Sequence, residues 1–207
     1  MSKGQETRRQ ILDEALAFAS EAGLERVSIG ALAERTNLSK SGLFAHFQSK
    51  EALELAIVNH AADRFVEDVV SPALRAPRGE PRVRAMLERW LGWSRAQAMP
   101  GGCVFVTSIS NAGKLPKAVR DRLTETQRDW LDALATAVRI AVAEGHFRAD
   151  LDAVQLAHEL LSVAYGHHLM ARLLAERATD ERWREATEHL LVGARVSASR
   201  ADSNESS

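Results

Sequence analysis

Apolar residues recur at helical spacing along almost the whole chain, and this periodicity constrains the fold more than any other feature of the sequence. Leu12, Ala15, Leu16 and Ala19 are one example, because positions three and four apart share a face of a helix. The longest strand-like run, Cys103–Thr107, leaves a helix and an extended segment both open. The sequence therefore predicts an all-α fold.

Capping residues and breaks divide this pattern into about nine helices. Residues Thr7 to Gln10 fit a capping box at the first helix, and Gly23 is suited to end it. Ser28, Ser39 and Ser49 are suited to begin the next three helices as N-caps. The expected ranges are 7–22, 28–36, 39–46, 49–72, 82–98, 104–112, 116–144, 152–176 and 180–196.

Composition excludes several classes of protein. The 207 residues are 45% hydrophobic, which is enough for a core, and a single cysteine excludes a disulfide framework. No apolar stretch approaches the roughly 20 residues of a membrane helix, and the N-terminus lacks the apolar segment of a signal peptide. We therefore expect a soluble, cytoplasmic protein with no membrane partner.

Residues 24–50 carry the most information about function. Two short helices, at about 28–36 and 39–46, are joined by a turn of three or four residues, which is the spacing of a helix-turn-helix. Asn37 tolerates the left-handed conformation that such a turn needs. The expected shared core of these helices is Leu32, Leu38, Leu43 and Phe47.

The outward face of the second short helix is then Lys40, Ser41, Phe44 and Ala45, with His46 at its end. A cation, a hydroxyl donor and an aromatic ring suit the major groove of DNA. Residues 1–50 carry one more basic than acidic residue, whereas the remainder carries two more acidic than basic residues. DNA binding would therefore depend on the placement of charges and on dimerisation rather than on bulk charge.

Lys50 adds a separate indication. It lies in the first turn of the expected fourth helix, where the helix dipole disfavours a positive charge. A bound phosphate would reverse that effect, because helix N-termini and lysines both favour anions. A solvated lysine without a partner is the alternative. Beside a helix-turn-helix, we interpret Lys50 as a phosphate contact.

The segments Val27–Ala33 and Ser39–Glu51 resemble the N-terminal signature of the tetracycline-repressor (TetR) family of transcription regulators, over roughly residues 5–60. The resemblance implies a nine-helix homodimer in which helices 1–3 bind DNA, helices 4–7 enclose a small molecule and the last two helices form a four-helix dimer interface. Family members often carry Tyr at Phe44 and a bulky ring at Ala45. The family's DNA-contacting positions fall on Ser28, Lys40, Ser41, Gly42, Phe44, His46 and Lys50.

These observations divide the chain into three parts. We expect a helix-turn-helix DNA-binding domain at residues 1–50 and a ligand-binding and dimerisation domain at residues 51–196. Residues 197–207 are rich in Ser, Asp and Asn and have no apolar stripe, so we expect a disordered tail.

The second domain contains helices that combine aromatic and polar residues, which a small-molecule cavity needs. Ordinary core packing is the alternative for each of them. Cys103 is interpreted as a buried structural cysteine rather than a redox sensor, because no basic residue lies near it in the sequence. The candidate ligand-binding residues are Met86, Trp90, Trp93, Phe105, Trp130, Leu134, Tyr165 and His168.

The last two helices carry apolar stripes with small residues that permit close helix packing. We interpret them as a dimer interface, and the core of a single-chain bundle is the alternative. The candidate interface residues are Leu160, Leu161, Ala164, Trp183, Ala186, Leu190 and Ala194.

Enzymatic motifs are incomplete. His158–Ser162 begins like a zinc-protease motif but lacks its second histidine, and no two histidines lie three or four positions apart. We expect no enzyme, no metal and no cofactor. The sequence favours a ligand-responsive repressor that binds a near-palindromic operator DNA as a homodimer. The alternatives are a helical ligand-binding module whose helix-turn-helix no longer binds DNA and, least favoured, an enzyme using Cys103 or His167.

Overall fold

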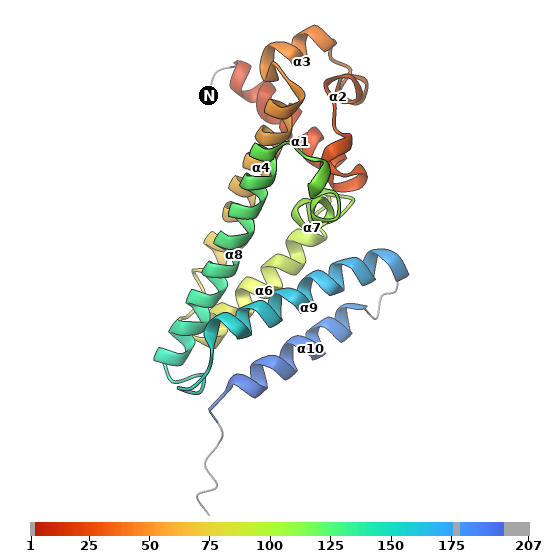
Figure 1. Ribbon diagram of the computed structural model, residues 1–207. Helices are drawn as coiled ribbons and strands as arrows, with labels where there is room; N and C mark the ends of the chain where they lie inside the picture. The colour runs from red at the N-terminus through yellow and green to blue at the C-terminus, as the bar shows by residue number, and fades with distance from the viewer. Residues whose placement is uncertain (1–2, 176–178, 197–207) are drawn as a thin grey trace, which may run out of the picture.

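The computed structural model describes residues 3–175 and 179–196, and these residues form an all-helical fold (Figure 1). Helix α4 continues through a π-helical turn (Val66–Val70) into the short α5 (Ser71–Ala73), so the described residues form nine helices, as predicted. Their bounds are α1 Lys3–Ala22, α2 Ile29–Thr36, α3 Lys40–Phe47, α4 Lys50–Phe65, α6 Glu80–Ser94, α7 Val104–Ile109, α8 Lys117–Ala143, α9 Ala153–Leu174 and α10 Thr179–Ala194.

Several helix ends differ from the sequence prediction. Helix α1 begins at Lys3, so Thr7 lies inside the helix and does not cap it. Helix α6 starts at Glu80, because a proline is tolerated in the first turn of a helix, and it ends at Ser94 rather than Ala98. The segment 103–107, for which a helix and an extended segment were both open, forms a helix that starts after Cys103. The expected disordered tail, residues 197–207, lies outside the described residues.

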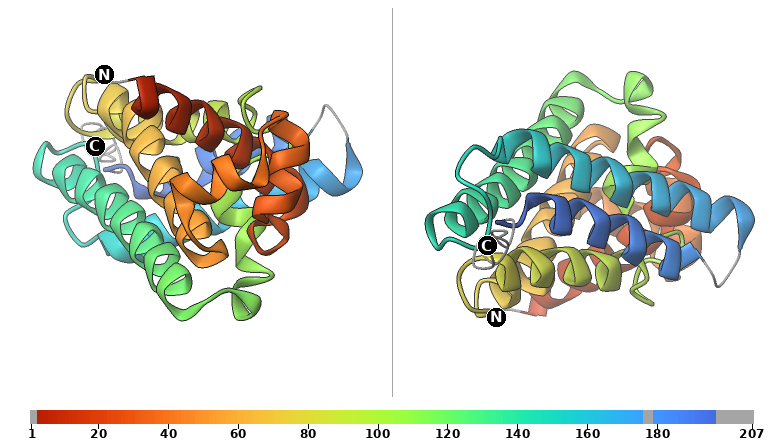
Figure 2. Two further views of the ribbon diagram at one scale, coloured as in Figure 1. Left: turned by 90° about the horizontal axis from the view of Figure 1, so that it is seen from above. Right: turned by 90° about the horizontal axis from the view of Figure 1, so that it is seen from below.

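The helices form two regions (Figure 1). Helices α1, α2 and α3 form a head at one end, and the long helices α4 and α8 run from this head toward the other end. Helices α9 and α10 pack side by side and lie in front when the molecule is seen from below (Figure 2). We call everything after α3 the bundle.

The core of the head is built from buried residues of three helices. Leu32, Leu43 and Phe47 are buried, as the sequence predicts. Leu38 was expected in this core but is 39% exposed, because it lies in the turn between α2 and α3 and on neither buried face. The shared core therefore depends on the two helices and not on the turn.

Polar contacts on two sides of α1 help to join the head to the bundle. Asp13 on α1 accepts hydrogen bonds from Arg64 (3.2 Å) and pairs with His60 (2.8 Å), both on α4. On another side of α1, the Gly101 amide donates to the Ser20 hydroxyl at 3.0 Å in a buried position. The head is thus attached both to a long helix and to the loop before α7. No described helix is long and apolar enough to cross a membrane.

Candidate nucleic-acid interface

Capping side chains fix the two helices of the predicted helix-turn-helix. The Ser28 hydroxyl accepts a hydrogen bond from the Ala31 amide at 3.1 Å, and the Ser39 hydroxyl accepts one from the Gly42 amide at 3.0 Å. Asn37 ends α2 in the left-handed conformation, at φ 54° and ψ 28°. These three predicted roles are confirmed, and together they fix where α3 begins relative to α2.

The N-terminal part of α3 presents a polar surface to solvent. Lys40, Ser41 and Gly42 are exposed, and the Phe44 side chain is 55% exposed. Lys40 has no hydrogen bond or ion pair within the described residues, and its side chain lies back over the start of α2, beside Gly30. We call Ser28, Lys40, Ser41, Gly42 and Phe44 together the α3 surface.

Two other predicted DNA contacts have partners inside the protein. His46 is half-buried, and its ring lies 6.1 Å from that of Phe47. Lys50 donates to the Glu25 carbonyl oxygen at 2.6 Å, and its Nζ lies 3.6 Å from the buried Glu54 carboxylate. Burial raises the pKa of Glu54, and Lys50 opposes that rise. Because an ammonium group has three donors, Lys50 retains the capacity to bind a phosphate as well.

Sequence reasoning missed one cation beside this surface. The Arg8 guanidinium lies over the Phe47 ring, 5.1 Å from its centroid. Arg8 is exposed, and its helix starts at the same end of the molecule as α3 (Figure 1). Its position depends on packing between residues 39 positions apart, so no local motif could have identified it. By contrast, Arg35 pairs with Glu21 at 2.8 Å.

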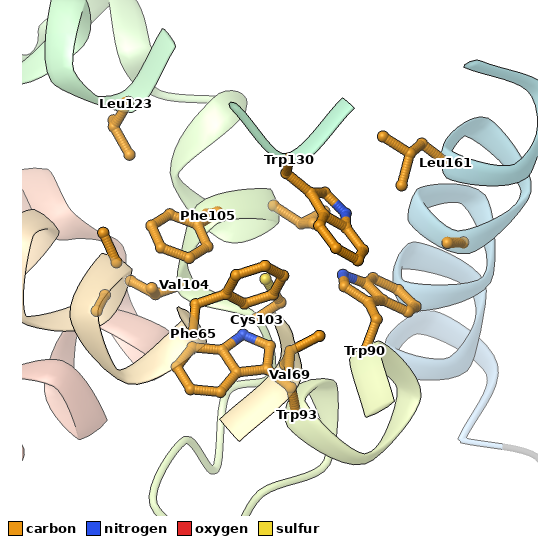
Figure 3. Packing of buried hydrophobic residues seen from close by; sticks show 14 of the residues in the cluster. Phe65, Val69, Trp90, Trp93, Cys103, Val104, Phe105, Leu123, Trp130 and Leu161 are labelled. Carbon is orange, nitrogen blue, oxygen red and sulfur yellow. The ribbon is translucent and has the colours of Figure 1, made fainter. Parts of the chain in front are cut away.

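The aromatic residues expected at a ligand cavity gather in the bundle, where they pack against one another (Figure 3). The Phe65 ring packs edge-to-face against three other rings. The distances between ring centroids are 4.9 Å to Trp130, 5.5 Å to Trp93 and 5.9 Å to Phe105. Trp90 lies 6.0 Å from the half-buried Tyr165. These contacts are typical of a well-packed core.

The other candidates are also buried in this region: Met86 and Leu134 are at most 1% exposed. Of the eight candidates, Trp93 and His168 border surface hollows, and they border different ones. Trp93 lines a groove with Asp68 and Arg89, whereas His168 lines a cleft with Arg95 and Arg172. The remaining six are buried or half-buried and line neither of these hollows, and their ligand role stays a prediction.

The candidate dimer residues also divide by burial. Five of them are buried within the single chain, and their part in a dimer interface stays a prediction: Leu160, Leu161, Ala164, Trp183 and Ala194. Ala186 and Leu190 are half-buried. The outward face instead exposes Met170 and Leu174, a difference that the sequence could not show because both faces of α9 are apolar.

The bundle shows a protected thiol. Cys103 is buried, and burial raises the pKa of its thiol, which disfavours the reactive thiolate. Within residues 3–175 and 179–196, no three His, Cys, Asp or Glu side chains are placed to hold a metal ion.

Both regions of the chain match models of known protein families. Residues 11–57 match the family model described as bacterial regulatory proteins, tetR family, and residues 79–187 match the tetracyclin repressor-like C-terminal domain. The regulator UidR of Escherichia coli K12 is 26% identical over 90% of this chain and 89% of its own length.

Two further similarities extend over most of the chain. The A-factor receptor protein of Streptomyces griseus is 24% identical over 86% of this chain. The matched part covers 62% of the receptor's own length. The crystal structure of a TetR-family regulator from Cytophaga hutchinsonii superposes with a TM-score of 0.81 at 24% identity, covering 95% of this chain and 98% of that one.

Proposed function

Because this chain belongs to the tetracycline repressor family of bacterial regulatory proteins, we propose that it is a ligand-responsive transcriptional repressor that binds a near-palindromic operator as a homodimer. The observation that carries this proposal is the α3 surface. Its α3 residues are exposed, two capping hydrogen bonds and the left-handed Asn37 fix the backbone, and Leu32, Leu43 and Phe47 anchor the two helices in a core. A preorganised helix of this kind fits the major groove.

The chemistry of the α3 surface assigns different roles to its residues. Lys40 and Ser41, at the N-terminus of α3, would contact base edges, where a lysine favours guanine and a serine accepts or donates. Ser28 and Gly42, together with His46 and Lys50 beside this surface, would position the DNA backbone, whose phosphates carry no sequence information themselves. Phe44 would make apolar contact with a thymine methyl group or the sugar edge.

The homodimer would form through the outward faces of α9 and α10, whose uncovered side is seen from below in Figure 2. Met170 is 49% exposed and Leu174 is 46% exposed, and both border a groove with Val163 and Ala186. Burying this apolar surface favours association. Met170→Lys should therefore yield monomers in light scattering, whereas Val66→Lys, at an equally exposed position on the π-helical turn, should leave the dimer intact.

Two copies of the α3 surface in a dimer would enter successive major grooves, about 34–36 Å apart. A small molecule bound in the bundle would then favour a dimer with a different spacing of the heads. The ligand and DNA would be coupled by their different affinities for the two conformations.

Selection of duplexes from a random DNA pool by the full-length protein tests this proposal. At two salt concentrations, we expect an enriched near-palindrome whose affinity falls at the higher salt. Arg139→Ala, at the far end of α8, removes a positive charge away from the head and should select the same sequence (Figure 1). An intact dimer that enriches no sequence would contradict the proposal and support the ligand-binding module.

A further inference from the structure

A cleft of about 400 Å³ lies between residues 94–102, which connect α6 to α7, and the C-terminal half of α9. None of its lining residues is among those labelled in the aromatic cluster of Figure 3. Ala96, Met99, Pro100 and Ala171 supply an apolar wall. A volume of this size accommodates a small organic molecule.

One side chain of the cleft is buried without a partner. His168 is 4% exposed, and its Nε2 has no hydrogen-bond partner within the described residues. Gly102, at φ 85°, packs against this ring so closely that a Cβ there would lie 2.3 Å from His168 Cε1. Buried polar atoms in proteins are nearly always hydrogen-bonded. This nitrogen is therefore a buried polar group that a hydrogen-bonding ligand in the cleft could satisfy.

The cleft also carries the positive charge of an exposed arginine. Arg172 lies one turn after His168 on the same face of α9, and it has no ion pair within residues 3–175 and 179–196. The nearby carboxylate of Asp180 pairs with Arg95 and lies 3.3 Å from His167 Nε2, so its partners are residues other than Arg172. Arg184, the next cation, pairs with Glu88 at 3.2 Å. An anion in the cleft could pair with the Arg172 guanidinium through charge-assisted hydrogen bonds.

We propose that this cleft binds the effector and that the effector is a small organic carboxylate, held by Arg172 and His168 with its apolar part against Met99 and Ala171. Only the regulatory role of the ligand rests on the proposed function, because carboxylate binding to the cleft can be measured without DNA. An Arg–carboxylate contact supplies charge-assisted hydrogen bonds, and an imidazole N–H can donate a further one. The apolar wall would distinguish such a ligand from an inorganic anion.

The cleft is directly connected to the DNA-binding head through two adjacent glycines. Gly102 contacts His168, while Gly101 donates its amide hydrogen to the Ser20 hydroxyl of α1 at 3.0 Å. The fit at Gly101 is so close that a Cβ would lie 1.8 Å from the Ser20 carbonyl oxygen. A ligand that shifts His168 would therefore shift the loop and, with it, α1. The route from the ligand to the head therefore runs from His168 to the Gly101–Gly102 pair and from there to Ser20 on α1.

Titration of full-length protein labelled with ¹³C at histidine Cε1 tests the binding site. Benzoate, phenylacetate and hexanoate, at constant ionic strength, should move the His168 signal in a saturable manner, and the corresponding neutral amides should not. Calorimetry on the same samples gives the affinity independently of signal assignment. No saturable shift with any carboxylate, or equal shifts with the amides, would overturn the proposal.

A matched pair of charge variants tests the role of Arg172. Arg172→Gln should weaken carboxylate binding about tenfold, as expected for loss of one charged hydrogen bond. Arg89→Gln removes an equally exposed arginine from the neighbouring groove and should bind as the wild type does. Equal affinities in the two variants would show that Arg172 does not hold the carboxylate.

A third arm separates this inference from the proposed function. The carboxylate that binds should change affinity for the selected operator severalfold, and Ser20→Ala should reduce that coupling without changing carboxylate binding. Carboxylate binding without any DNA selection would overturn the proposed function and keep the cleft. DNA selection without carboxylate binding would overturn the cleft and keep the repressor. Unchanged coupling in Ser20→Ala would overturn the route through α1.

Discussion

The head and the bundle use similar residue types for opposite purposes. Phe44 in the head is 55% exposed on the α3 surface, whereas Trp90 in the bundle is 1% exposed inside the core. Both were singled out from the sequence as candidate binding residues. The comparison teaches that Phe44 is exposed because the buried Leu43 and Phe47 hold its short helix from the other side, whereas Trp90 is positioned by contacts with other helices.

The largest expected effect contrasts these two aromatic residues. Trp90→Ala should lower the free energy of unfolding by about 3–5 kcal/mol, because it leaves a cavity in a packed core. Phe44→Ala should change it by less than about 0.5 kcal/mol, because the ring is largely in solvent, while it weakens DNA binding. Urea unfolding of both variants measures the difference. Equal losses of stability would refute the division into surface and core.

The next effect concerns His168 and the pH dependence of stability. Burial, with the charges of Arg172 and His167, lowers the pKa of His168 to about 4 from its ordinary 6.5. The unfolded chain therefore binds more protons between these values, so stability is full above about pH 6.5 and is lost as the pH falls toward 4. A pKa difference of one unit corresponds to about 1.36 kcal/mol, so the effect of His168 on the free energy of unfolding is about 3 kcal/mol.

Urea titrations at a series of pH values compare the wild type with His168→Gln. The variant should show a shallower decline in stability between pH 6.5 and pH 4, because glutamine does not titrate. Identical declines would mean that His168 is not held neutral by the fold.

A smaller effect tests the turn of the head. Asn37→Ala should destabilise the protein by about 1 kcal/mol, because alanine lacks the local hydrogen bonding that makes the left-handed conformation tolerable for asparagine. Asn37→Gly should match the wild type or exceed it slightly, since glycine adopts that conformation freely. Thermal unfolding of the three proteins provides the ranking, and an alanine variant as stable as the glycine variant would contradict the geometry of the turn.

The smallest effect on stability is expected at Lys50. Its side chain is 52% exposed, and the buried Glu54, whose pKa burial already raises, can take up a proton when Lys50 is lost, so the cost should stay below about 1 kcal/mol. The same variant, Lys50→Ala, should weaken binding to all DNA sequences alike and make the salt dependence shallower by about one charge if the amine contacts a phosphate. An unchanged salt dependence would restrict Lys50 to the internal contacts with Glu25 and Glu54.

The sequence predicted the head more completely than the bundle, for a physical reason. Ser28, Asn37 and Ser39 act on groups within three residues of themselves or through their own backbone conformation, so local chemistry determined their roles. The fold class and the number of helices followed in the same way from periodicity and breaks. Leu38 and Arg8 show the limit, because their positions depend on contacts beyond the motif.

The bundle required information about which helix faces meet. Phe65, at the centre of the aromatic cluster, contacts Trp130 from a helix 65 positions away, and no spacing in the sequence indicates this. Leu160 and Met170 both lie on apolar stretches of α9, yet one is buried and the other faces outward. The cleft beside His168 likewise depends on a contact across the chain, because Gly102 has no side chain and lets its loop approach His168 on α9.

The most direct test of the central claim, that the α3 surface reads DNA sequence, compares two duplexes and two proteins. The wild type and Lys40→Ala are titrated, at one salt concentration, with the selected operator and with a duplex of the same composition in scrambled order. We predict that Lys40→Ala loses about 1–3 kcal/mol of affinity for the operator and much less for the scrambled duplex. An equal loss for both duplexes, or no loss, would contradict the claim.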